Sequence, residues 1–151
     1  MTALTGRTNA KYIIVMLDNA AGTLTNITAY VNDIGQVGLD YETVDVTAFS
    51  DGVTNIVIGR PSAPLTLGGP FDSVMHAQAI GVNGLPAEIL SLDIRIGVRA
   101  AWETGAPQFG ITQSASSGYL MHSYQTDGVT WSAQLDVFGP TAPAWGTTAE
   151  T

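Results

Sequence analysis

The chain has 151 residues, no cysteine, and a formal net charge of −8 from five Lys and Arg against 13 Asp and Glu. A chain of this length can bury a sizeable core as one domain, and the lack of cysteine excludes disulfides and thiolate metal sites. Its acidity disfavours lasting binding to nucleic acid, which needs clustered cations. Only 12% of the residues are charged, against about 25% in typical domains, which favours a surface that partners cover.

Residues 1–10 are small and polar without periodicity, so we expect a flexible N-terminal arm that becomes ordered against a neighbour. The segment lacks the apolar run of a signal peptide, and no apolar stretch approaches the length of a membrane span. These features predict synthesis in a cytoplasm and no membrane anchoring.

The first half of the chain contains several strand patterns. Residues 12–18 are rich in β-branched side chains and end at a turn over 19–22, and residues 24–31 alternate as a second strand. Residues 41–49 and 54–58 predict a hairpin, because Ser, Asp and Gly at positions 50–52 tolerate a tight reversal.

Prolines and glycines at 59–64 are expected to end that hairpin before a short strand over 65–67, because proline cannot donate to a strand ladder. Residues 71–80 then form the best helix pattern, with Asp72 or Ser73 as N-cap.

The second half is also strand-like. Residues 90–98 alternate strictly between apolar and other side chains. Residues 118–125 and 129–137 predict a hairpin across an Asp-Gly turn, and residues 139–151 form an extended C-terminal tail anchored by Trp145. The sequence therefore predicts a single, mainly β domain over 1–151: a sandwich or barrel of about eight strands with one short flanking helix.

No pattern in the chain supports an active site. His76 and His122 lie on different predicted elements with no cysteine to complete a metal site. The acids Asp40, Glu42 and Asp45 lack the spacing of a calcium loop and favour a solvated strand face. We find no nucleophile elbow and no phosphate-binding loop, so we expect no enzyme activity, no catalytic residue, no metal and no cofactor.

Three tryptophans keep one alternative open. Trp102, Trp131 and Trp145 could stack on a sugar in a carbohydrate-binding or hydrolytic module. Each lies in or beside an apolar stretch, so burial is the simpler interpretation.

The chain contains a series of short motifs in this order: AYVND (29–33), VDVTAFSD (44–51), IGR (58–60), LTLGGPFD (65–72), VTWSAQLD (129–136) and PAWG (143–146). In sequence and order, these motifs resemble those of the tail tube proteins of long-tailed bacteriophages. Together they comprise 36 of the 151 residues. Related sandwich modules recur in phage heads and connectors.

The resemblance implies a β-sandwich with a flanking helix, six copies in a ring, and rings stacked into a hollow tube for DNA ejection. It implies a virion location, contacts with further copies and other tail proteins, passage of genomic DNA without specific binding, and no catalytic residue. We expect Asp40, Glu42 and Asp45 to face the lumen or the ring junction, unless they are ordinary surface acids. The alternative function is a capsid decoration, head-stabilising or connector protein built on a similar sandwich.

Overall fold

The computed structural model describes residues 6–7 and 10–151, so most of the arm expected over 1–10 lies outside the described residues. The described part is mainly β, as predicted, with eight strands of four residues or more and one α-helix. The strands are β1 (Ile13–Asp18), β2 (Leu24–Asn26), β3 (Asp33–Ile34), β4 (Asp40–Asp45), β5 (Ile56–Ser62), β6 (Leu65–Pro70), β7 (Leu92–Ile96), β8 (Gln108–Ile111), β9 (Gly118–Thr126), β10 (Thr130–Phe138) and β11 (Ala144–Gly146). The helical elements are the 3-10 turns η1 (Ala10–Tyr12) and η2 (Thr28–Tyr30) and the helix α1 (Ser73–Ile80).

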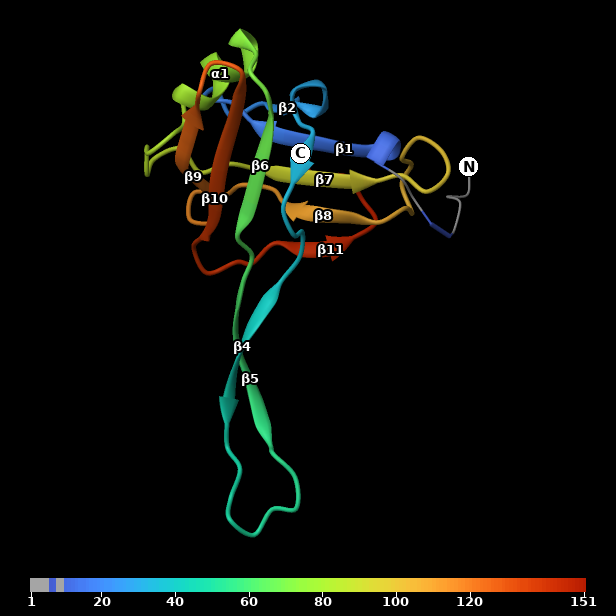
Figure 1. The fold of residues 1–151 in the computed structure, drawn as a ribbon, viewed down its shortest axis with the longest axis vertical. Coiled ribbons are helices and arrows are strands. Elements are labelled where there is room, and N and C mark those ends of the chain that lie inside the picture. The colour runs from blue at the N-terminus through green and yellow to red at the C-terminus, as the bar shows by residue number, and fades with distance from the viewer. Residues whose placement is uncertain (1–5, 8–9) are drawn as a thin grey trace.

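Two sheets form the body of the molecule, and their strands cross steeply in Figure 1. The first, called sheet A, has the order β11-β8-β7-β1-β2, and the second, called sheet B, has the order β3-β6-β10-β9. The strand pairs recorded in both sheets are antiparallel. Helix α1 lies at the end of the body beside the turn between β9 and β10 (Figure 1).

The core lies between the inner faces of the two sheets. Sheet A contributes Leu17, Leu92 and Phe109, and sheet B contributes Leu67 and Leu135, all of them almost fully buried. A side chain of this size gains roughly 1.5–3 kcal/mol by leaving water. The body therefore has its own source of stability.

The alternation of β10 decides which face of sheet B is buried. Trp131, Ala133 and Leu135 point into the core, whereas Ser132 and Gln134 between them are exposed. Because side chains alternate along a strand, the opposite face of sheet B is open. The predicted hairpin over 118–125 and 129–137 is confirmed as β9 and β10, with a register shift at Gln134/Leu135.

Glycine allows a close crossing over β6. A Cβ at Gly69 would clash with the Tyr30 carbonyl oxygen at the end of η2. The indole Nε1 of Trp131 donates to that same oxygen at 3.0 Å. The crossing explains why β6 continues through a Gly-Gly-Pro run, so the strand is longer than the predicted 65–67.

A separate two-stranded hairpin, β4–β5, projects from the body (Figure 1). Its strands pair antiparallel from Asp40↔Ser62 to Asp45↔Ile56, with a register shift between Tyr41 and Thr43. The predicted hairpin is confirmed, but its first strand ends at Asp45 and not at Phe49, and residues 46–55 form a longer connection than the predicted tight reversal at 50–52. The expected break at 59–64 is wrong in part, because β5 includes Pro61, which is tolerated in a strand that has no second neighbour.

The predicted strand over 24–31 is also wrong in its second half. After Asn26 the chain turns into η2, and the Asn26 side-chain oxygen accepts the Thr28 backbone N–H at 3.0 Å. Local side-chain bonds of this kind compete with strand ladders. The predicted helix is confirmed as α1, and the Asp72 carboxylate caps it by accepting the Val74 N–H at 2.8 Å.

Within residues 6–7 and 10–151 no helix has the length and hydropathy that a membrane span requires.

The C-terminal tail contributes β11, which pairs with β8 at the edge of sheet A.

Candidate functional site

The β4–β5 hairpin exposes an apolar surface that the body does not cover. Every residue of β4 is exposed, and Phe49 beyond it has a relative exposure of 113%. The exposed apolar side chains of residues 40–62 are Tyr41, Val44, Val46, Phe49, Val53, Ile56, Val57 and Ile58. So many apolar side chains in water on a single hairpin mark an interaction surface.

The tip of the hairpin is held by its own hydrogen bonds. Asp45 accepts the Thr47 N–H at 2.9 Å, and Asp51 accepts the Ala48 N–H at 2.7 Å and the Asn55 side chain at 3.0 Å. The bond from Thr47 lowers the pKa of Asp45, and the bond from Ala48 lowers that of Asp51. These bonds define the shape of the tip, but a two-stranded hairpin without packing is at best marginally stable in water.

The acids singled out in the sequence lie together on β4. Asp40, Glu42 and Asp45 are all exposed. Glu42 packs over Gly59, where it accepts the Arg60 backbone N–H at 3.3 Å. Their placement in the lumen or at a ring junction stays a prediction.

The open face of sheet B carries uncharged polar side chains. Thr66, Thr130, Ser132 and Gln134 are exposed on β6 and β10. None of the four strands of sheet B contains Lys or Arg. His122 Nε2 on this face lies 2.8 Å from an Asp136 carboxylate oxygen, and both side chains are about half exposed.

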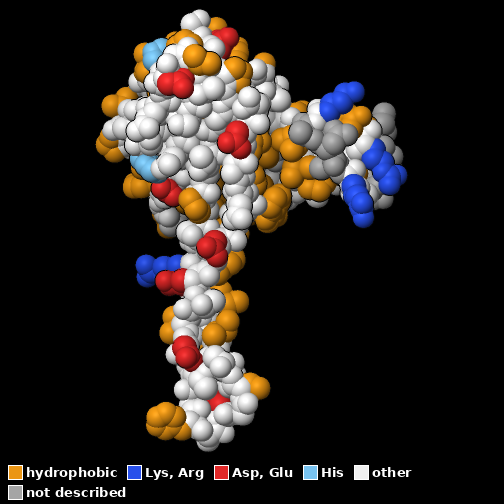
Figure 2. All heavy atoms as spheres, in the orientation of Figure 1, with side chains coloured by type: hydrophobic (Ala, Val, Ile, Leu, Met, Phe, Trp, Pro, Cys, Tyr) orange, Lys and Arg blue, Asp and Glu red, His pale blue; other side chains and the backbone are white. Residues whose placement is uncertain are grey.

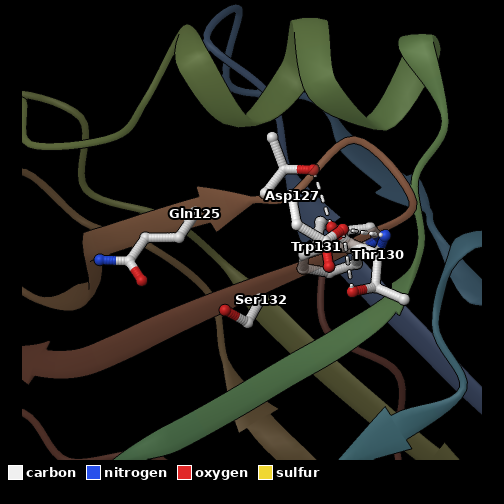
Figure 3. A pocket seen from close by; sticks show the side chains of 6 residues that line it. Gln125, Asp127, Thr130, Trp131 and Ser132 are labelled. Carbon is white, nitrogen blue, oxygen red and sulfur yellow. Dashed lines mark hydrogen bonds between the residues drawn. The ribbon is translucent and has the colours of Figure 1, made fainter.

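A shallow hollow of about 300 Å³ lies at the end of the β9–β10 hairpin, where Gln125 and Ser132 line it (Figure 3). Asp127 lies at its rim and accepts the backbone N–H groups of Val129 and Thr130, each at 2.8 Å. These bonds lower the pKa of Asp127. The carboxylate is therefore engaged by the backbone of the turn and by the Thr130 hydroxyl, which donates to it at 3.4 Å.

The edges of both sheets offer unpaired backbone groups. In the described residues β9 and β3 are the outer strands of sheet B, and β2 and β11 those of sheet A. β9 has nine residues, and a long edge strand is a template for pairing with another chain. Its first part is already engaged, because Tyr119 exchanges backbone bonds with Leu90 and the Met121 carbonyl accepts the Gly84 N–H, so residues 122–126 are the part left for such pairing.

Two buried carboxylates, which the sequence analysis did not identify, stabilise the body. Asp18 accepts the Ser91 N–H at 2.8 Å, and burial raises its pKa. Asp93 accepts a short bond from Arg95 at 2.6 Å and the Glu150 backbone N–H at 3.1 Å. They tie the start of β7 and the C-terminal tail to sheet A. Their signal in the sequence was weak, because Asp93 occupies a polar position of an alternating strand and Asp18 stands at the end of an apolar run, where a turn follows.

The tryptophans and histidines have structural partners. Trp131 is 3% exposed, Trp102 Nε1 donates to the Pro107 carbonyl at 3.0 Å, and Trp145 packs on Phe109 with ring centroids 4.9 Å apart. His76 Nδ1 lies 3.0 Å from the Tyr124 hydroxyl. Across the part of the chain that the structure describes, no group of three His, Cys, Asp or Glu could hold a metal ion.

Comparison with known proteins finds likeness in structure and not in sequence. No protein-family model and no curated protein matches the chain. A chain of the tail of an empty gene transfer agent particle, determined with C6 symmetry, is 17% identical with a TM-score of 0.57, over 92% of this chain and 98% of that one.

Two further structures come from other particles. A chain of the anti-feeding prophage cap, which terminates a tube, is 11% identical with a TM-score of 0.58, over 98% of this chain and 96% of that one. A chain of the sheath-tube complex of an extracellular contractile injection system is 13% identical with a TM-score of 0.53, over 94% and 93%. The chain therefore has the phage tail tube fold that its sequence motifs predicted.

Proposed function

We propose that this chain is a structural tail tube subunit of a phage-like particle, which assembles into stacked hexameric rings that conduct DNA during ejection. The observation that carries the proposal is the exposed apolar hairpin on a body with a tail tube fold. The C6 symmetry of the gene transfer agent tail supports six copies per ring. The role requires no catalysis, and it gives the protein a virion location and other tail proteins as partners.

The hairpin supports assembly because its apolar side chains have no packing partner within a single copy. Its apolar side chains find no cover within one copy, and another copy would bury them at a gain of about 25 cal/mol per Å². A projection that fits a different surface of the next copy makes a head-to-tail contact, which closes a ring or extends a stack. The edge strand β9 offers a second contact through its backbone groups.

The open face of sheet B supports a channel wall. Passing DNA would adhere to Lys or Arg through phosphate contacts, and the strands of this sheet carry neither. Uncharged Thr, Ser and Gln side chains would leave the DNA free to slide. In this arrangement Asp40, Glu42 and Asp45 on the hairpin belong to the ring junction and not to the wall.

Electron microscopy tests the assembly. Negatively stained purified protein should contain rings of six or tubes, and class averages of end views give the copy number. Discrete trimers, or monomers that bind emptied heads, would overturn the proposal in favour of a capsid decoration protein.

Substitutions test the channel wall separately from assembly. Lysine at Ser132 and Gln134, both exposed on β10, should slow DNA ejection from particles that still form tails, because each cation adds a phosphate contact. The single variant Ser132→Gln, which has glutamine at both positions because residue 134 is already Gln, is the uncharged control. If the two lysines leave ejection unchanged, sheet B does not face the lumen.

A further inference from the structure

Most cations of this acidic chain gather at one end of sheet A. Figure 2 shows Lys and Arg side chains collected on the lobe beside the body. Arg7, Lys11 and Arg99 are exposed. The Arg99 guanidinium lies against the backbone at Gly6, and the Gly97 N–H donates to the Tyr12 carbonyl at 2.9 Å, which holds the two segments together. This end is a cationic patch on a molecule with a net charge of −8.

An apolar groove begins next to this patch. It has a volume of about 300 Å³ and lies between β1 and the segment from η2 to β3. Ile13, Val15, Val31 and Ile34 supply its apolar lining, and Asp33 is its one acid. Ile13 directly follows η1, which contains Lys11, so the groove and the cations adjoin. We call the groove and the three exposed cations together the corner.

The hairpin carries the complementary chemistry. Residues 40–62 contain four acids and one arginine, a formal charge of −3 from −4 and +1. Its exposed apolar side chains, such as Val44, Val46, Ile56 and Ile58, lie among these acids. In Figure 1 the hairpin points away from the end of sheet A at which the corner lies, so it does not fill its own corner.

We propose that the hairpin of one copy docks in the corner of another copy, with apolar side chains in the groove and the acids toward Arg7, Lys11 and Arg99. The proposal rests on the assembly proposed above and adds its receiving surface. Opposite charges would orient the hairpin, since complementary potentials fix register and exclude wrong partners.

The end of the body around α1 is a second surface that could receive the hairpin, but its charge is unfavourable. That end exposes the apolar Val74 and Val129. It also carries Asp72 and Asp127, which would repel an acidic hairpin, since juxtaposed like charges oppose association.

Charge reversal tests the contact. Arg99→Glu or Glu42→Lys should each raise the protein concentration needed for tube formation about tenfold at low salt, where charges are poorly screened. The double variant Arg99→Glu/Glu42→Lys should return to within about threefold of the wild type, because the opposite pair is restored. Arg99→Glu/Glu88→Lys makes the same charge change at a position outside the hairpin and should not recover.

The outcomes separate this contact from the proposed function. If the wild type forms tubes and both double variants are weakened in tube formation to the same extent, the proposed contact is wrong and the tail tube assignment is unaffected. A wild-type chain that stays monomeric at every concentration would overturn the assignment, and the contact with it. Circular dichroism of each variant establishes that the body remains folded.

Discussion

The body and the hairpin use similar strands in opposite surroundings. In β7, Leu92 and Ile94 are almost fully buried between two sheets, whereas Ile56 and Ile58 in β5 are more than half exposed. The strands of the body are stable because their apolar faces meet. Those of the hairpin keep their apolar side chains in water until another molecule covers them. Under the proposed assembly, the contrast separates residues that stabilise one copy from residues that would join copies.

The sharpest test of this contrast replaces apolar side chains on the hairpin. The triple variant Phe49→Ser/Val53→Ser/Ile58→Ser should form no tubes at concentrations at which the wild type does, because burying each such side chain is worth roughly 1.5–3 kcal/mol. Sedimentation of assembled protein measures the loss. The melting temperature of the monomer should hardly change, and a large fall would mean that the hairpin packs on the body.

The reverse experiment removes a core side chain. Leu92→Ala should reduce the free energy of unfolding by about 2–5 kcal/mol, since the mutation leaves a cavity at a residue that is 0% exposed. Ile58→Ala is the matched control on the hairpin, and we expect a change within about 0.5 kcal/mol. Urea denaturation of the monomer measures both, and similar losses for the two variants would contradict the division.

Two capping carboxylates extend the comparison to polar groups. Asp72 accepts a backbone N–H at 2.8 Å at the start of α1, and Asp51 accepts one at 2.7 Å at the hairpin tip. Asp72→Ala should lower the unfolding free energy by about 1 kcal/mol, as loss of an N-cap does. Asp51→Ala should leave the unfolding midpoint of the body unchanged, and a matching shift would mean that tip and body unfold as one unit.

How far the sequence predicts this molecule depends on the range of the interactions. The β9–β10 hairpin and the cap of α1 follow from local signals, the Asp-Gly turn and Asp72. β8 (Gln108–Ile111) was not predicted, because its Gln and Gly residues lack a strand pattern and are paired by β7 and β11. The extension of β6 through Gly69 likewise depends on a crossing with Tyr30, far away in the sequence.

The candidate site shows the same limit. The sequence predicts the hairpin and places Asp40, Glu42 and Asp45 on its first strand, as the structure has them. It cannot show that this hairpin lacks a packing partner, because Val44, Val46 and Ala48 alternate with polar residues much as core strands do. The sequence could not predict the corner either, because its cations come from residues 7, 11 and 99, which the fold alone brings together.

The smallest expected effect concerns a buried carboxylate of the body. Desolvation raises the pKa of Asp18 above its ordinary value of 3.8, against the opposing hydrogen bonds from Ser91. As the pH falls from 7 through this raised pKa, the folded chain takes up a proton that the unfolded chain does not yet bind. The unfolding free energy of the wild type should therefore rise relative to that of Asp18→Asn, which cannot titrate there.

The difference between the two proteins is the useful measurement, because all other titrating groups cancel. Asp45 and Asp51 on the hairpin, whose pKa values are lowered, act in the opposite direction in both proteins and are removed by the subtraction. Urea denaturation at several pH values between 4 and 7 gives the two profiles. Parallel profiles would mean that Asp18 is solvated in the folded chain and that its burial in the body does not raise its pKa.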